Sequence, residues 1–199
     1  MRRPGRCALV TGVGRRRSIG SGIAVGLAED GWNLALNFWQ LYDERLGYQR
    51  GVTDPQDVAQ ECRALGATVV LLPGDLADPD TPASLVTAAS QRLGRLDGLV
   101  LSHCESVNSS ILSTTVEAWD RHFAVNARAT WLLVRAFAEQ LGPGAAVDRP
   151  APIVALTSDH TAHNTPYGAS KGRCSAWRDR DQRVSHTLRM CSQCAADVG

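Results

Sequence analysis

Short apolar runs alternate with longer segments of helical periodicity along most of this chain, and that alternation limits the folds open to it. We predict strands at Cys7–Thr11, Asn33–Phe38, Thr68–Leu72, Gly98–Ser102 and Pro152–Thr157. Helices are predicted between them at Ile19–Asp30, Pro55–Leu65, Pro82–Leu93 and Val116–Leu141, with Gln40–Thr53 as a polar loop. Because strand–helix–strand units join parallel strands through right-handed crossovers, the pattern predicts an α/β fold, a Rossmann-like doubly wound parallel sheet with about five recognisable strands.

The composition fits one globular domain and excludes several kinds of partner. The 199 residues carry a net charge of +1, so no strong field attracts nucleic acid or an anionic membrane. No stretch approaches the roughly 18 apolar residues of a membrane span, and the apolar run behind the basic N-terminus is too short for a signal peptide. The six scattered cysteines are typical of reduced thiols. We therefore expect a cytoplasmic protein that binds neither nucleic acid nor membrane.

A glycine-containing turn follows the first predicted strand and leads into the first predicted helix. Such a turn lets backbone amides approach a pyrophosphate, and the positive end of the helix dipole faces the anion. We predict cofactor contacts from Gly12, Gly14, Arg15, Arg16, Arg17, Ser18, Ile19 and Gly20. The turn contains no Gly-Lys-Ser/Thr sequence, which argues against a nucleoside-triphosphate P-loop.

The three consecutive arginines Arg15–Arg17 have two interpretations. They form either a solvated loop or a site for the 2′-phosphate of NADP, because guanidinium groups bind phosphate through paired hydrogen bonds. The end of the second predicted strand, Asn37–Gln40, offers no acidic side chain for a ribose 2′-hydroxyl, although Asp43 follows. We therefore expect NADP to be preferred over NAD.

Tyr167 and Lys171 form the sharpest chemical signal in the chain. On a helix, residues four apart lie on one face, so the phenol and the ammonium can converge on one substrate. A phenol is a poor acid or base near neutral pH until a cation stabilises its phenolate. Such pairs also arise by chance, but Lys171 is the only lysine among 21 basic residues.

Several motifs occur together in the order found in one enzyme family. They are the turn from Thr11 to Gly20, Asp75-Leu76, Asn126, Ser158 and Tyr167 to Lys171. With these motifs the chain resembles the short-chain dehydrogenase/reductase family over about residues 6–171. The resemblance implies an NAD(P)-dependent oxidoreductase that transfers hydride between the cofactor and a small-molecule ketone or secondary alcohol.

The resemblance also implies roles for individual residues. Tyr167 would exchange the proton with the substrate oxygen, while Lys171 would hold the nicotinamide ribose and lower the pKa of Tyr167. Ser158 would hydrogen-bond the substrate, and Asn126 would hold a proton-relay water. Asp75 would contact the adenine. Leu76 and Ser102 complete the predicted cofactor site.

The chain departs from the family pattern in three places. The glycine turn is two residues longer than usual and has Ser18 in place of its middle glycine, which resembles a subgroup related to 3-ketoacyl reductases. The usual Asn-Asn-Ala-Gly after the fourth strand is replaced by a sequence that includes Ser102, His103 and Cys104. Ser158 precedes Tyr167 by nine residues, where about thirteen is common in the family.

The C-terminal segment differs in character from the rest. We predict a dinucleotide-binding domain over residues 1–171 and an atypical tail over residues 172–199, with no further strand. Its few apolar residues could share one helix face: Cys174, Trp177, Val184, Leu188 and Cys191. The family's last strands are not recognisable here, as in a truncated copy or a frame-shifted end.

This tail leaves alternative functions open. One is a catalytically inactive, truncated dinucleotide-binding remnant, and another is a nucleotide-responsive interaction protein. We predict no metal site, because neither Asp159, His160 and His163 nor the pair Cys191 and Cys194 has a complete ligand set. The helix that carries Trp119 and Trp131 makes a homo-oligomer plausible, since the family associates through this helix.

Overall fold

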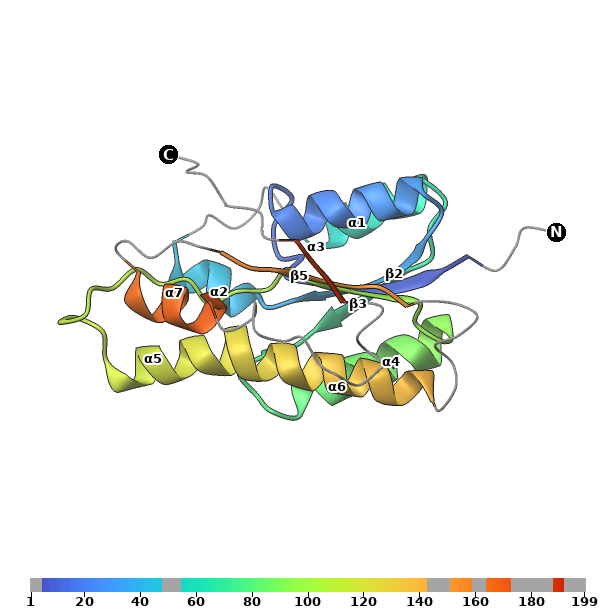
Figure 1. Ribbon diagram of the computed structural model, residues 1–199. Helices are drawn as coiled ribbons and strands as arrows, with labels where there is room; N and C mark the ends of the chain where they lie inside the picture. The colour runs from blue at the N-terminus through green and yellow to red at the C-terminus, as the bar shows by residue number, and fades with distance from the viewer. Residues whose placement is uncertain (1–4, 48–54, 143–150, 159–163, 173–187, 192–199) are drawn as a thin grey trace.

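A parallel sheet of six strands forms the centre of the computed structural model, which describes residues 5–47, 55–142, 151–158, 164–172 and 188–191 (Figure 1). The strands are β1 (Cys7–Thr11), β2 (Asn33–Phe38), β3 (Val69–Pro73), β4 (Gly98–Leu101), β5 (Ile153–Leu156) and β6 (Leu188–Cys191). Their order in the sheet is β3-β2-β1-β4-β5-β6. The chain changes direction between β1 and β4, and ligands bind at such a switch point in open α/β sheets.

Helices cover both faces of this sheet. On one face lie α1 (Ile19–Glu29) and α3 (Pro55–Ala64), and on the other lie α4 (Thr81–Leu93) and α6 (Ala129–Leu141) (Figure 1). The helix α5 (Val116–Phe123) continues into α6 through a π-turn, η1 (Ala124–Arg128). Two shorter helices, α2 (Gln40–Arg45) and α7 (Thr165–Gly172), lie at the same end of the sheet (Figure 1).

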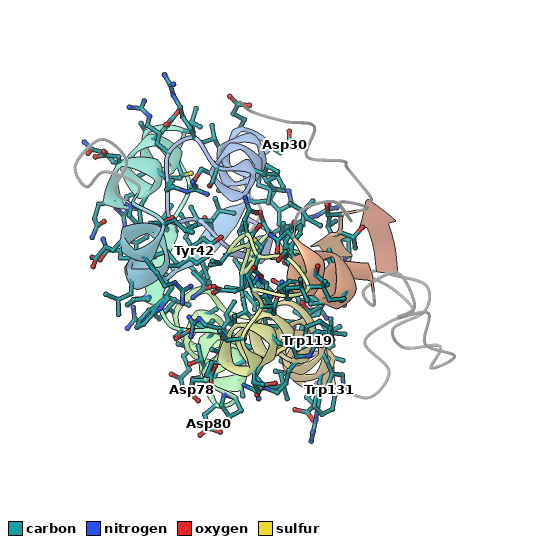
Figure 2. All side chains as sticks on the ribbon, turned by 90° about the vertical axis from the view of Figure 1, so that its left-hand side faces the viewer. Asp30, Tyr42, Asp78, Asp80, Trp119 and Trp131 are labelled. Carbon is teal, nitrogen blue, oxygen red and sulfur yellow. The ribbon has the colours of Figure 1, made fainter. Side chains whose placement is uncertain are left out.

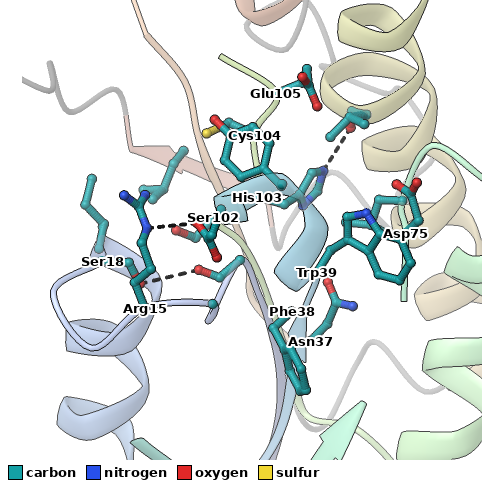
Figure 3. A pocket seen from close by; sticks show the side chains of 18 of the residues that line it. Arg15, Ser18, Asn37, Phe38, Trp39, Asp75, Ser102, His103, Cys104 and Glu105 are labelled. Atoms are coloured by element: carbon teal, nitrogen blue, oxygen red, sulfur yellow. Dashed lines mark hydrogen bonds and ion pairs between the residues drawn. The ribbon is translucent and has the colours of Figure 1, made fainter. Parts of the chain in front are cut away.

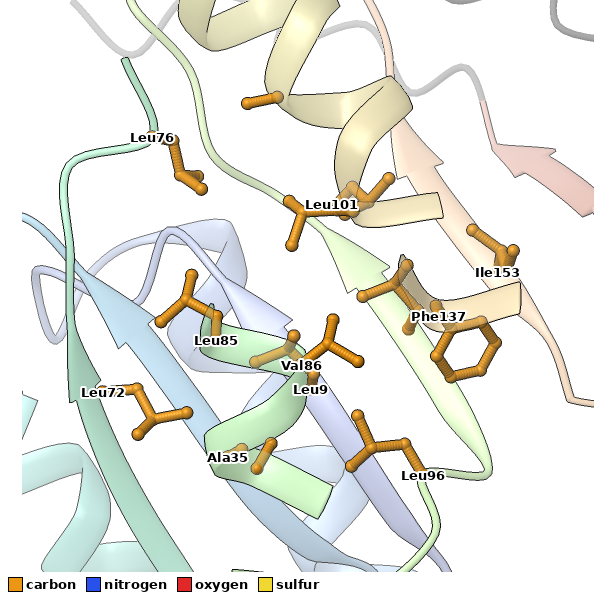
Figure 4. Close-up of a cluster of buried hydrophobic side chains, with 14 of the residues drawn as sticks. Leu9, Ala35, Leu72, Leu76, Leu85, Val86, Leu96, Leu101, Phe137 and Ile153 are labelled. Carbon is orange, nitrogen blue, oxygen red and sulfur yellow. The ribbon is translucent and has the colours of Figure 1, made fainter. Parts of the chain in front are cut away.

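Each of the first five strands contributes side chains to two cores. Leu9 packs on the α4–α6 side with Phe137 and Leu99 (Figure 4), whereas its neighbours Ala8 and Val10 pack on the α1–α3 side. Successive side chains of a strand point to opposite faces, so strands buried on both faces are apolar throughout. This is why the first five strands could be predicted within about one residue. The prediction of a Rossmann-like doubly wound sheet is confirmed.

The prediction of no strand after Lys171 is wrong. The sixth strand, β6, pairs in parallel with β5, and Ile153 lies opposite Leu188. An edge strand offers unpaired backbone groups to any neighbour, so pairing needs no apolar pattern. Leu188 and Cys191 therefore lie on a strand and not on the predicted helix face. The other residues of that face, Cys174, Trp177 and Val184, lie outside the described residues.

Two further predictions need correction. Residues 40–45 of the predicted loop form the helix α2, which has no buried residue, and residues 48–53 lie outside the described part. The single helix predicted at Val116–Leu141 contains the π-turn η1. At its end the Ala129 amide bonds the Ala124 carbonyl, five residues back, so the turn is wider than an α-helical turn.

His103 ties the π-turn to the sheet. Its Nδ1 lies 2.7 Å from Thr11 Oγ1, and its Nε2 lies 3.1 Å from the Val125 carbonyl. A neutral ring that donates from Nε2 and accepts at Nδ1 satisfies both contacts. The side chain is 5% exposed. It therefore joins the ends of β1 and β4 to η1 from inside the molecule.

We expect His103 to make the fold less stable as the pH falls. Burial, together with the nearby Lys171 charge, lowers the pKa of His103 from 6.5 to about 3. The unfolded chain binds this proton below about pH 6.5 while the folded chain does not, so folding loses up to about 1.4 kcal/mol per pH unit between the two values. Urea unfolding from about pH 7 to about pH 5 measures this slope.

The matched variant is His103→Gln, which keeps hydrogen-bonding capacity but does not titrate. Its free energy of unfolding should fall less steeply than that of the wild type over the same pH range. Equal slopes for the two proteins would show that His103 is not the group responsible.

Candidate active site

A pocket opens at the carboxyl ends of β1, β2, β4 and β5, where the sheet order reverses (Figure 3). It collects most of the residues predicted from the sequence. The predicted residues that line it are Gly12, Gly14, Arg15, Arg17, Ser18, Ile19, Asp75, Leu76, Ser102, Tyr167 and Lys171. Four others are not in its lining: Arg16, Gly20, Asn126 and Ser158.

The glycine turn has the backbone form that a phosphate-binding turn needs. Gly12 has a φ of 76°, and a Cβ there would meet the Ser102 carbonyl carbon and oxygen at 2.7 Å. A Cβ on Gly20 would lie 2.7 Å from the Gly12 carbonyl oxygen. Side chains are therefore excluded from both positions, and the turn packs directly against the end of β4.

The first helix presents its N-terminus to the same pocket. Ser18 caps α1 by accepting a hydrogen bond from the Ser21 amide at 3.2 Å. The first α-helical bond runs from the Gly22 amide to the Ser18 carbonyl, so the amides of Ile19 and Gly20 precede it and have no intrahelical acceptor. These amides, the helix dipole and the glycine turn fit the pyrophosphate of a dinucleotide.

The three arginines of the turn have different surroundings. Arg15 pairs with Asp43, with 3.1 Å between Nε and Oδ1. Arg16 lies 3.7 Å from Glu61 on α3 and does not line the pocket, so its predicted cofactor contact is not supported by the geometry. Arg17 is exposed and lines the pocket. Two of the three arginines, Arg15 and Arg17, thus line the pocket.

Lys171 is held at the opposite side of the pocket by two carbonyl groups. Its Nζ donates to His103 O at 3.0 Å and to Leu156 O at 3.2 Å, at the ends of β4 and β5. Although the residue is 4% exposed, an ammonium has three donors, and one remains for a ligand. Tyr167 lies one turn earlier on α7 and lines the pocket too.

Asn126 lies outside the pocket lining and hydrogen-bonds to two segments beside the pocket. Its Oδ1 accepts from the Glu105 amide at 2.8 Å, and its Nδ2 donates to Glu105 O and to Ser170 Oγ, each at 2.9 Å. Ser170 Oγ in turn donates to Tyr167 O. Asn126 therefore joins η1, the segment after β4 and α7 through side-chain hydrogen bonds.

Ser158 follows β5 by two residues and is half-buried. The predicted order, with Ser158 shortly before Tyr167, brings it to the same end of the sheet. Asp159, His160 and His163, which were weighed as metal ligands, lie outside the described residues, as does Cys194.

A chain of charges that the sequence did not predict crosses the pocket. Glu105, with a side chain 3% exposed, accepts from Arg45 at 2.7 Å and from Arg121 Nε at 3.1 Å. Arg121 also binds Asp75, with 3.1 Å between Nη2 and Oδ1. Asp75 lines the pocket, and its carboxylate already has a cationic partner, Arg121.

Other lining residues were not predicted from the sequence, and most lie at or just after strand ends, whereas Tyr42 lies on α2 and Val125 on η1. They include Asn37, Phe38, Trp39, Tyr42, Gly74, His103, Cys104, Val125, Leu156 and Thr157. Burial, with the neighbouring Cys104 and Glu105, raises the pKa of Tyr42, which keeps this phenol neutral. Position after a predicted strand was the signal for most of these residues, since such positions meet at one edge of a parallel sheet.

Known proteins share this fold and this arrangement of elements. The family model described as enoyl-(acyl carrier protein) reductase matches residues 12–178. L-rhamnose 1-dehydrogenase (NAD(P)(+)) of Sphingomonas is 29% identical over 166 residues, covering 81% of this chain and 61% of that protein. Versicolorin reductase 1 of Aspergillus parasiticus is 29% identical over 194 residues, covering 91% and 66%.

Solved structures agree. A 3-oxoacyl-[acyl-carrier protein] reductase from Brucella melitensis in complex with NAD superposes with a TM-score of 0.72 at 29% identity, covering 88% of this chain and 66% of that one. A dehydrogenase/reductase from Sinorhizobium meliloti superposes with a TM-score of 0.71 at 28% identity, covering 87% of this chain and 64% of that one. The chain spans about 61% of the length of the L-rhamnose 1-dehydrogenase and 66% of that of the versicolorin reductase.

Among the described residues, no helix has the length and apolar character to cross a membrane. The family match covers most of the chain, and the fold, the glycine turn and the pocket agree with it. The protein belongs to the short-chain dehydrogenase/reductase family.

Proposed function

We propose that this protein transfers hydride between NADP(H) and a small-molecule ketone or secondary alcohol. The observation that carries the proposal is that Tyr167 and Lys171 face the same pocket as the glycine turn. When bound, the nicotinamide supplies or accepts the hydride. The protein then has to exchange one proton with the substrate oxygen and to hold both reactants in place.

Tyr167 is the group we assign to the proton. Tyr167 lines the pocket from α7, one helical turn before Lys171. The positive charge favours the phenolate, so the side chain can accept a proton from an alcohol or return one to a carbonyl oxygen. We assign Ser158 to hydrogen-bond the substrate oxygen and Asn126 to hold the wall of the site behind Tyr167.

In this proposal Lys171 also positions the cofactor. Two of its donors are fixed by His103 O and Leu156 O, which aims the third at the pocket. A ribose hydroxyl is a suitable acceptor there. The lysine therefore positions the nicotinamide end of the cofactor and acts on Tyr167 from one place.

The preference for NADP rests on the adenosine end of the pocket. Arg15 and Arg17 line it, and β2 ends in Asn37 and Phe38 without an acidic side chain. A 2′-phosphate gains charge-assisted hydrogen bonds from guanidinium groups.

We also expect the protein to act in the cytoplasm.

Self-association is a further part of the proposal. Trp119 and Trp131 are 38% and 47% exposed on α5 and α6, and both project from the α5–α6 side (Figure 2). The ring of Trp119 stacks on Phe123 with 4.8 Å between centroids. Exposed tryptophans of this kind are typical of interfaces, so we expect a homo-oligomer that buries them.

Substitution of the phenol tests the catalytic assignment. Tyr167→Phe should lower kcat at least about a hundredfold, because general acid–base catalysis contributes about 10² or more. The dissociation constant for NADPH, measured by nicotinamide fluorescence, should stay within about twofold. The turnover assay uses the best ketone from a panel tested with the wild type. Unchanged kcat would refute the role of Tyr167, and failure of the wild type to bind either cofactor would favour the inactive remnant.

The arginines provide a test with an internal control. The double variant Arg15→Gln/Arg17→Gln should weaken NADPH binding about tenfold more than NADH binding, since only NADPH carries the 2′-phosphate. The neighbouring Arg16→Gln removes the same charge from a side chain outside the pocket and should leave both dissociation constants unchanged. Equal losses for NADPH and NADH in the double variant would contradict the proposed phosphate contact.

A further inference from the structure

The helix that carries Tyr167, α7, is preceded by a buried asparagine, Asn164, which is 1% exposed. The Asn164 carbonyl accepts the first helical bond, from the Gly168 amide at 3.1 Å. Its side-chain Oδ1 accepts from the Tyr167 amide at 3.4 Å. Asparagine is preferred at such an N-cap position, because its oxygen satisfies an amide that has no intrahelical acceptor. Asn164 therefore holds the backbone of the residue that we assign to the proton transfer.

The nitrogen of the same side chain binds a different part of the chain. Nδ2 donates to Ser106 Oγ at 3.2 Å and to Asn108 Oδ1 at 3.1 Å. One residue further along, the Thr165 amide donates to the Ser109 carbonyl at 3.3 Å. All three acceptors lie in the connection between β4 and α5. Since an N-cap needs only the side-chain oxygen, the bonds from Nδ2 are not required for capping and have another consequence.

The connection that receives these bonds is itself attached to the helix on its other side. Asn126 of η1 binds both backbone groups of Glu105. The Val107 amide donates to Nε2 of His122 on α5 at 3.3 Å, and the His122 side chain is 1% exposed. Asn164 thus joins the start of α7 to a segment that is hydrogen-bonded to α5 and η1.

The helix α7 is therefore held at both ends. Near its C-terminus Lys171 bonds to two strand-end carbonyls, and Ser170 bonds to Asn126. A helix held at one end can still turn about that end, so the attachment through Asn164 sets its direction. Tyr167 lies between the two attachments. A group that transfers a proton depends on this placement, because an error of about 1 Å can lower a rate about a hundredfold.

We propose that Asn164 is a positioning residue, which joins the start of α7 to the connection after β4 and so fixes where Tyr167 meets the substrate oxygen. This inference rests on the proposed function of Tyr167. It assigns two separate effects to one side chain. The oxygen of Asn164 caps the helix and supports its stability, whereas the nitrogen determines the place of the helix and supports the rate of the reaction.

Substitution by serine separates the two effects. Asn164→Ser keeps a capping oxygen but removes the amide that reaches Ser106 and Asn108. We expect kcat to fall about tenfold, while the dissociation constant for NADPH stays within about twofold. The free energy of unfolding should fall less than in Asn164→Ala, which loses the cap as well. The matched control Ser113→Ala removes hydrogen bonds to Ser110 in the same connection and should leave kcat unchanged.

A double-mutant cycle on kcat identifies the bond responsible. Asn108→Ala removes one acceptor of Asn164 Nδ2 at an exposed position and should lower kcat by itself. In the Asn164→Ser background it should have no further effect, because the bond that it would break is already absent. Losses that multiply in the double variant would show that the two residues act separately, which contradicts the inference.

A spectroscopic measurement tests the placement of Tyr167 without turnover. In full-length protein labelled with fluorotyrosine, the fluorine NMR resonance of Tyr167 is assigned by its absence from Tyr167→Phe. Asn164→Ser should shift or broaden this resonance and leave that of Tyr42 unchanged. Ser113→Ala should leave both resonances unchanged.

Either of two outcomes in Asn164→Ser would overturn the inference: an unchanged kcat, or a Tyr167 resonance identical to that of the wild type. A wild type that binds NADPH but reduces no ketone of the panel would instead count against the proposed function. The fluorine spectra would then still decide whether Asn164 positions Tyr167.

Discussion

The buried ammonium of Lys171 is the interaction on which the geometry of the site depends. A charge taken out of water is unfavourable unless hydrogen bonds replace its hydration, and two strand-end carbonyls, those of His103 and Leu156, provide them. Since these carbonyls belong to neighbouring strands, α7 is fixed over the point where β4 and β5 end. Tyr167 acquires its position from this attachment.

The π-turn η1 supplies the second attachment of the site. A wider turn displaces carbonyl groups from regular α-helical bonding, and here the Val125 carbonyl receives its hydrogen bond from the His103 ring. The same turn carries Asn126, which binds Glu105 and Ser170. The π-turn η1 is therefore hydrogen-bonded both to the segment after β4 and to α7, the helix of Tyr167.

The sequence predicts the parts of the fold that depend on local chemistry. The first five strands have continuous apolar runs because both of their faces are buried, and the glycine turn is required by close backbone packing at Gly12. The helix α2 and the strand β6 could not be predicted from local chemistry. Ion pairs made by Asp43 and Arg45 help to hold α2 in place, while β6 is positioned by backbone pairing with β5. Neither interaction leaves a periodic pattern in the sequence.

The same distinction applies to the site. Tyr167, Lys171 and the turn form short motifs with a direct chemical meaning, whereas Glu105 and Arg121 acquire theirs only through partners far along the chain. The overall net charge of +1 gives no indication of these paired charges.

Charge within the pocket is nearly balanced, and the balance governs how a dinucleotide binds. Arg15, Arg121 and their acidic partners are paired across the pocket. A phosphate that binds Arg15 or Arg121 would therefore displace a carboxylate from it. Each exchange replaces one ion pair by another, so the net gain is smaller than a bare arginine would give. In such a site affinity and selectivity are adjusted by the acidic residues as much as by the basic ones, and neither can be inferred from a count of arginines.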